Sequence, residues 1–96
     1  MIELKTHVVV TTEHRGVFFG RLEARDDGQK RVELSEARNC VYWSRDTRGF
    51  IGLAATGPLG DSRVGPAAPL IELTDVTAIV VCTPEAVEHW EKAPWS

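Results

Sequence analysis

An Asp-Gly pair between two segments with strand character is the feature that most constrains how this chain folds. Asp27-Gly28 follows the segment "VFFGRLEA" and precedes "RVEL", in which apolar and charged residues alternate. Asp-Gly readily adopts the positive φ angles of a hairpin turn, and alternation is typical of a strand with one buried face. The sequence therefore predicts a β-hairpin over residues 17–34. Gly20 lies inside its first strand and predicts that this strand is bent.

Four further segments have the composition of strands. The segment "HVVVTT" is rich in β-branched residues, and "RNCVYW" alternates without a plainly polar face. We expect a corner at "SEA" to separate "RVEL" from "RNCVYW". The four predicted strands are residues 7–12, 38–43, 70–73 and 76–82.

The C-terminal part of the chain carries clear helix signals. Thr83 is a good N-cap, Pro84 suits the first helical position, and Pro94 ends the helix. A second segment, residues 47–56, is predicted to form one or two helical turns with Asp46 or Thr47 as its cap, although its two glycines disfavour a helix. Residues 57–69 are dense in glycine and proline and are expected to form a surface loop.

Together these elements predict one α+β domain over residues 1–96. We expect a mostly antiparallel, strongly bent β-sheet or small barrel with one short C-terminal helix. At 96 residues the chain is long enough for one core. No signal-peptide pattern and no apolar run of the ~20 residues needed to span a bilayer is present. We therefore expect a cytoplasmic protein without a membrane partner.

The charge distribution argues against long nucleic acid as a partner. The net charge is −3, and from residue 66 to the end five acidic residues face a single lysine. A duplex-binding domain normally carries a broad positive surface, which this sequence does not provide. Between residues 15 and 63, however, nine basic residues exceed seven acidic ones. A small anionic ligand remains compatible with this local excess.

The segment "ARNCVYWSRDTRGF", residues 37–50, concentrates arginines and aromatic residues. Arginine matches phosphate oxygens with two parallel hydrogen bonds, and aromatic faces stack on bases. The segment therefore predicts a site for a phosphorylated, base-containing ligand, to which an arginine of the following loop could contribute across a subunit boundary. The candidate residues are Arg38, Tyr42, Trp43, Arg45, Arg48, Phe50 and Arg63.

A structural interpretation of the same segment stays open. Tyr42 and Trp43 could pack in the core or in an oligomer interface while the arginines extend to solvent. With three tryptophans in so small a domain, we expect some aromatic surface to be covered by another copy of the chain. A homo-oligomer is the predicted assembly.

Other chemistry has little support in the sequence. The three histidines show no ligand spacing with Cys40 or Cys82, so no metal site and no cofactor are predicted. Both cysteines lie in apolar segments, where a thiol is usually buried and inert. We expect a protein that is not an enzyme.

Two resemblances accompany these patterns. The bent strand, Asp-Gly turn and following strands are loosely similar to Sm-like and SH3-like small barrels, but the acidic "CTPEAVEHW" replaces the basic residues through which Sm proteins bind RNA. The chain more closely resembles a family of small phage- and prophage-encoded proteins of uncharacterised function. That resemblance rests on four short motifs. They are "GVFFG" at 16–20, "AR" at 37–38 with "YW" at 42–43, "LA" at 53–54 with Gly57, and Thr83 with "PW" at 94–95. Asn39 and Cys40 depart from the pattern, where a second arginine and a bulky apolar residue are expected.

The resemblance implies an accessory protein of a mobile genetic element. Combined with the arginine-aromatic segment, it leads us to expect a non-catalytic binding protein, in its sharpest form a host-defence antagonist that sequesters a nucleotide-type signal. The alternative is a protein-protein inhibitor or assembly factor that binds a host protein through the acidic C-terminal helix, with Glu85, Glu88, Glu91 and Trp95.

Overall fold

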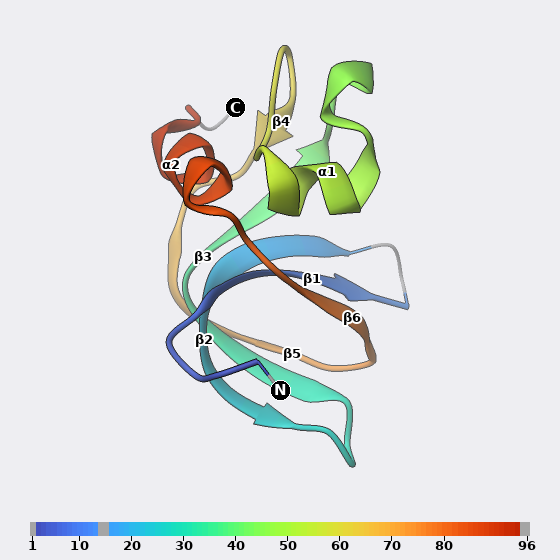
Figure 1. Cartoon of the computed structure of the whole chain (residues 1–96). Coiled ribbons are helices and arrows are strands. Elements are labelled where there is room, and N and C mark those ends of the chain that lie inside the picture. The colour runs from blue at the N-terminus through green and yellow to red at the C-terminus, as the bar shows by residue number, and fades with distance from the viewer. Residues whose placement is uncertain (1, 14–15, 95–96) are drawn as a thin grey trace.

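The computed structural model describes residues 2–13 and 16–94 and shows a bent antiparallel sheet with helices at one end (Figure 1). Trp95 lies outside the described residues, and of the "PW" motif the structure describes only Pro94. The elements in chain order are β1 (His7–Thr12), β2 (Val17–Asp26), β3 (Arg31–Tyr42), the 3-10 turn η1 (Arg45–Thr47), α1 (Gly49–Ala55), β4 (Arg63–Val64), β5 (Ala68–Leu73), β6 (Val76–Val81) and α2 (Pro84–Lys92).

The six strands form one sheet in the order β4-β3-β2-β1-β6, and β5 pairs with the first half of β3 beside β4. Every pairing is antiparallel. Strands β5 and β6 follow each other in sequence but share no ladder in the described part of the chain, so the sheet stays open between them. The α+β prediction is confirmed, with a bent open sheet and a short C-terminal helix, and α1 confirms the helical turns predicted within residues 47–56.

The predicted hairpin is confirmed as β2 and β3, but two details differ from expectation. Its turn spans four residues, Asp27 to Lys30, and Lys30 takes a positive φ of 54°. The expected corner at "SEA" does not end the strand: β3 continues for 12 residues, and Glu36 adopts a φ of 50° within it. A residue with a positive φ bends the strand without ending it. Local composition does not distinguish such a bend from a corner between two separate strands.

Gly20 allows the bend of β2, as predicted. The register of the β2–β3 pairing shifts twice, once across Gly20, between Phe19 and Arg21, and again between Leu22 and Ala24. A Cβ atom at position 20 would lie 2.8 Å from Leu34 Cβ, closer than real Cβ atoms approach. Only glycine lets the two strands approach this closely.

The bent sheet has a core on each face. Val9 of β1 belongs to the helix-side core, with Phe19, Leu53 and Trp90, whereas Val8 and Val10 belong to the core enclosed by the bend of the sheet. All three valines are fully buried. Because successive side chains of a strand point to opposite faces, the run "VVV" can be buried throughout only between two cores.

Trp90 joins the two helices to the sheet. Its ring stacks on Phe19 with centroids 5.0 Å apart, and its Nε1 donates a hydrogen bond to the Leu53 carbonyl of α1 at 3.0 Å. The helix that carries it begins as predicted, since the Thr83 hydroxyl accepts from Ala86 N at 3.0 Å. The cap predicted for the other helix, Asp46 or Thr47, is wrong. Arg48, with a φ of 66°, precedes α1, and its side chain makes no capping hydrogen bond.

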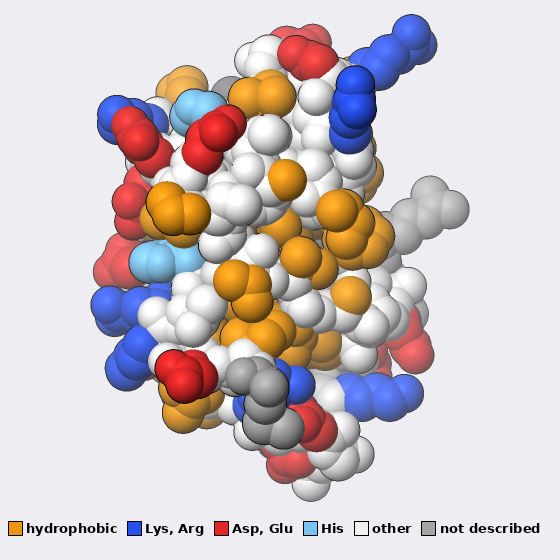
Figure 2. Space-filling model, in the orientation of Figure 1, with side chains coloured by type: hydrophobic (Ala, Val, Ile, Leu, Met, Phe, Trp, Pro, Cys, Tyr) orange, Lys and Arg blue, Asp and Glu red, His pale blue; other side chains and the backbone are white. Residues whose placement is uncertain are grey.

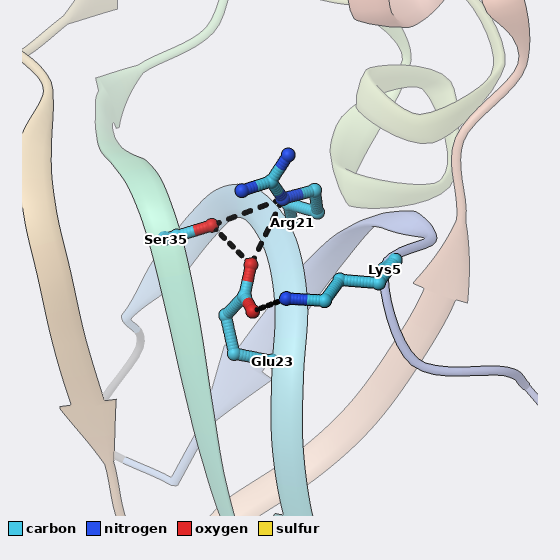
Figure 3. A network of polar contacts seen from close by, with 4 residues as sticks. All are labelled: Lys5, Arg21, Glu23 and Ser35. Atoms are coloured by element: carbon cyan, nitrogen blue, oxygen red, sulfur yellow. Dashed lines mark hydrogen bonds and ion pairs between the residues drawn. The ribbon is translucent and has the colours of Figure 1, made fainter.

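A polar network ties the segment before β1 to the hairpin (Figure 3). The Glu23 carboxylate contacts Lys5 Nζ and accepts from Arg21 Nε at 2.9 Å and from Ser35 Oγ at 2.6 Å. Hydrogen bonds from Lys5, Ser35 and Arg21 lower the pKa of Glu23 from 4.5 to about 2. The carboxylate is therefore ionised in the folded protein over nearly the whole pH range.

This pKa shift predicts how acid affects stability. As pH falls from 4.5 to about 2, the unfolded chain binds a proton at Glu23 before the folded chain does, so the stabilisation by this network is lost in that window. We expect Glu23→Gln to be less stable than wild type at neutral pH, and the difference to shrink as the pH approaches 2. Urea unfolding across the pH range measures both. Glu33→Gln is the matched control, because Glu33 forms no ion pair with the described residues; equal pH profiles for the two variants would contradict the assignment.

Candidate functional site

A buried polar cluster positions the segment that sequence analysis singled out. Ser44 and Thr47 are only 5% and 1% exposed. Ser44 N donates to Ser62 Oγ at 2.9 Å, and the Thr47 hydroxyl accepts from Leu59 N at 3.1 Å. The turn after β3 is thereby held against the loop that leads into β4. Arg45 follows Ser44, and Arg63 follows Ser62. The Ser44–Ser62 hydrogen bond therefore brings the backbones of the two arginines close together.

Beside this cluster the ends of β3 and β4 form an open cleft, here termed the Tyr42–Arg63 cleft. Tyr42 lies opposite Arg63 in the β3–β4 ladder. The cleft has a volume of about 390 Å³ and is lined by Val41, Tyr42, Asp61 and Arg63. Val41 is 64% and Tyr42 51% exposed, which is unusual for such large apolar surfaces at the end of a strand. An aromatic face, a cation and a carboxylate therefore border the same hollow.

Five basic side chains have carboxylate partners, whereas the arginines of the η1 turn and of β4 have none among the described residues. Lys5, Arg21, Arg25, Arg31 and Lys92 all form ion pairs. Within residues 2–13 and 16–94, no ion pair and no side-chain hydrogen bond involves the side chain of Arg45, Arg48 or Arg63, and all three are exposed. Figure 2 shows two basic side chains extending from the upper right of the molecule, over the segment of η1 and α1. Guanidinium groups without internal partners remain available to an external anion.

Arg38 has a different environment from the other candidate arginines. Its Nε donates to Gly65 O at 2.8 Å, and its Nη1 lies 2.6 Å from the carbonyl oxygens of Trp90 and Ala93. It thus closes the C-terminal end of α2, whose last carbonyls have no partner within the helix. Burial lowers the pKa of Arg38, but a guanidinium remains protonated in proteins. The structure places Arg38 outside the Tyr42–Arg63 cleft.

The remaining candidate aromatics contribute mainly to packing. Trp43 and Phe50 are half-buried and pack against the helix-side core. Of the seven predicted site residues, the structure places Tyr42 and Arg63 in the lining of the cleft, whereas Arg45 and Arg48 are exposed in the turn after β3 and do not line it. Sequence analysis missed Val41, Asp61 and the Ser44–Ser62 contact, because these depend on the pairing of β3 with the short β4.

A second and larger hollow, of about 650 Å³, lies below the end of α2. Its lining includes the carboxylates of Glu36 and Glu91 beside Arg38. Because the Arg38 donors already bind carbonyls, the two carboxylates dominate its charge. This hollow is therefore less suited to an anion than the Tyr42–Arg63 cleft.

The two thiols lie in the helix-side core and are not joined in a disulfide. Burial raises the pKa of Cys40 to about 11 and that of Cys82 to about 12. Neither sulfur forms the thiolate that nucleophilic chemistry needs at neutral pH. Among the described residues, no three histidine, cysteine or acidic side chains come together as metal ligands.

Comparison with protein families gives one match. The model described as "Domain of unknown function (DUF6948)" covers residues 5–90. The chain belongs to this family. The matched region includes the whole Tyr42–Arg63 cleft with Arg45 and Arg48. Comparisons with curated proteins and with solved structures found no significant match. No helix of the described residues is long and apolar enough to cross a membrane.

The contacts of Arg38 predict a role in stability. Arg38→Met keeps much of the side chain's apolar volume but leaves the carbonyls of Gly65, Trp90 and Ala93 without their donor. We expect the free energy of unfolding to fall by about 3 kcal/mol, as for other buried charged hydrogen-bond networks. Urea unfolding measures the loss. Arg48→Met, at an exposed arginine without such contacts, should change stability by less than ~0.5 kcal/mol. Equal stabilities of the two variants would show that Arg38 does not hold the helix end.

Proposed function

We propose that this chain is a non-catalytic binding protein that holds a small phosphorylated ligand with an aromatic base in the Tyr42–Arg63 cleft. The observation that carries the proposal is that Arg63, which has no ion pair among the described residues, lines the same hollow as the half-exposed Tyr42. Arg45 and Arg48, likewise without ion pairs, lie in the turn that the Ser44–Ser62 hydrogen bond holds against the loop before β4.

The chemistry of the cleft suits both halves of a nucleotide. The arginine forks can each donate two parallel hydrogen bonds to phosphate oxygens. Tyr42 offers a face on which a base can stack, and Val41 adds apolar surface beside it. Asp61 can accept a hydrogen bond from a base amino group or a sugar hydroxyl. Trp43 and Phe50 support the segment from the core side.

Passive binding rather than turnover is the proposed activity. The raised pKa values of Cys40 and Cys82 argue against a thiol nucleophile. Together with the resemblance to small phage and prophage proteins, this supports an accessory protein that acts in the cytoplasm and withholds a nucleotide-type signal from a host defence system.

Substitution of the cleft arginines tests the proposal. Native mass spectrometry of protein from a nucleotide-rich lysate identifies a retained ligand, and calorimetric titration with adenosine monophosphate and with uncharged adenosine measures the phosphate contribution. We expect the monophosphate to bind more tightly than adenosine. Arg45→Ala and Arg63→Ala should each weaken it about tenfold, which corresponds to ~1.4 kcal/mol.

Arg25→Ala is the matched control, since Arg25 lies at the far end of the hairpin and pairs with Asp27. It should leave the affinity unchanged. A ligand that binds equally well to the Arg45, Arg63 and Arg25 variants would remove these residues from the site. Steady hydrolysis of the bound nucleotide by the pure protein would overturn passive binding.

A protein partner on α2 is the second candidate function. Glu85, Glu88 and Glu91 are exposed along this helix, although Glu88 already pairs with Lys92 at 2.7 Å. A basic partner surface would fit this acidic face. Lysine substitution at Glu85 and Glu91 together would abolish such an interaction without touching the Tyr42–Arg63 cleft, so the two functions separate in one experiment.

A further inference from the structure

Strand β6 differs from every other strand in having no buried residue. Its sequence "VTAIVV" is apolar except for one threonine, yet all six residues are half-buried or exposed, and Val81 is 49% exposed. In β1, its neighbour, the three central residues are fully buried. Figure 2 shows apolar side chains gathered over the region where β6 and α1 lie in Figure 1, and α1 adds Ile51, 56% exposed. Val76, Ile79 and Val80 pack against the two cores without being buried, so the strand keeps apolar surface that a partner can cover.

The outer edge of β6 also carries unused backbone groups. Cys82 N donates to His7 O, so residues 78, 80 and 82 exchange hydrogen bonds with β1. Ile79 and Val81 alternate with them and direct their N–H and C=O groups away from β1. In the described part of the chain no strand pairs with this edge.

Protective features found on other edge strands are missing from β6. Strand β5 carries Pro69 and Glu72, and β4 carries Arg63, all of which disfavour pairing with another strand. Residues 76–81 contain no charge and no proline, and the one register irregularity lies at its start, opposite Thr11 and Thr12. The second half of β6 is therefore open to pairing.

We infer that β6 is a dimerisation strand, which pairs antiparallel with β6 of a second copy of this chain about a two-fold axis near Val80. This register matches Ile79 with Val81 of the second copy, and Val81 with its Ile79. Each match joins two residues whose backbone groups face outward, and their β-branched side chains lie on the same face. The interface closes at two copies because the pairing is its own symmetry mate.

The composition of the strand favours a second copy over an unrelated partner. In a two-fold interface each residue meets a copy of its own surroundings, so any charge near the axis would meet a like charge. An uncharged strand flanked by apolar side chains satisfies this condition. The inference is independent of the Tyr42–Arg63 cleft, since none of the cleft residues belongs to β6.

Sedimentation velocity of the full chain over a dilution series tests the dimer. We expect wild type to sediment with twice the mass of one chain. Val81→Lys should sediment with the mass of a single chain, because the pairing would bury two lysines. Leu70→Lys is the matched control: Leu70 is an exposed apolar residue on β5, 58% against 49% for Val81, and its variant should remain dimeric. Wild type that is monomeric throughout, or a Val81→Lys variant that stays dimeric, would overturn the inference.

Amide hydrogen exchange on wild type gives a test that does not depend on a folded variant. The amides of Ile79 and Val81 should be protected in the concentrated protein and should exchange faster on dilution, whereas those of Val80 and Cys82 bond to β1 and should not change. A dimer in which the Ile79 and Val81 amides exchange freely would use another surface and would refute this pairing.

Discussion

The burial of β1 on both faces is the constraint on which the rest of the structure depends. Val8, Val9 and Val10 point alternately to two cores, so the chain must supply apolar cover on both sides of one small sheet. The bend of β2 and β3 supplies the inner cover, because the sheet folds over its own face. The helices supply the outer cover, and Trp90 fills the space between them and the sheet.

This division of the cover leaves the Tyr42–Arg63 cleft outside both cores. The helices and η1 lie at the end of the sheet where β3 meets β4, and the polar contacts of Ser44 and Thr47 hold that end together. A smaller hollow, of about 250 Å³, lies beside the inner core, where basic and acidic residues of the hairpin turn line it together. The Tyr42–Arg63 cleft lies at the ends of β3 and β4, and residues of both strands and of the loop before β4 line it.

The arginines of the chain show how similar residues take different roles. Arg38 lies in the middle of β3 and reaches the end of α2, where three carbonyls bind it. Arg21 and Arg25 face acids on the same hairpin, and Arg31 pairs with Glu72 of β5. Arg45, Arg48 and Arg63 form no ion pair with the described residues, although Asp61 lines the same hollow as Arg63. Their sequence neighbours alone do not separate these groups, because the carbonyls that bind Arg38 lie 27 to 55 residues away along the chain.

Local chemistry by itself determined part of the secondary structure of this protein. The Asp-Gly turn, the glycine in β2 and the cap at Thr83 each act within a few residues, so the hairpin, its bend and the start of α2 follow from the sequence. Contacts between distant residues decided the rest. The continuity of β3 through Glu36, the open seam between β5 and β6, the removal of Arg38 from the site and the addition of Val41 and Asp61 to it all depend on which strands pair. Pairing is a property of the whole sheet, since it minimises exposed apolar surface and unsatisfied backbone groups together, and no single segment encodes it.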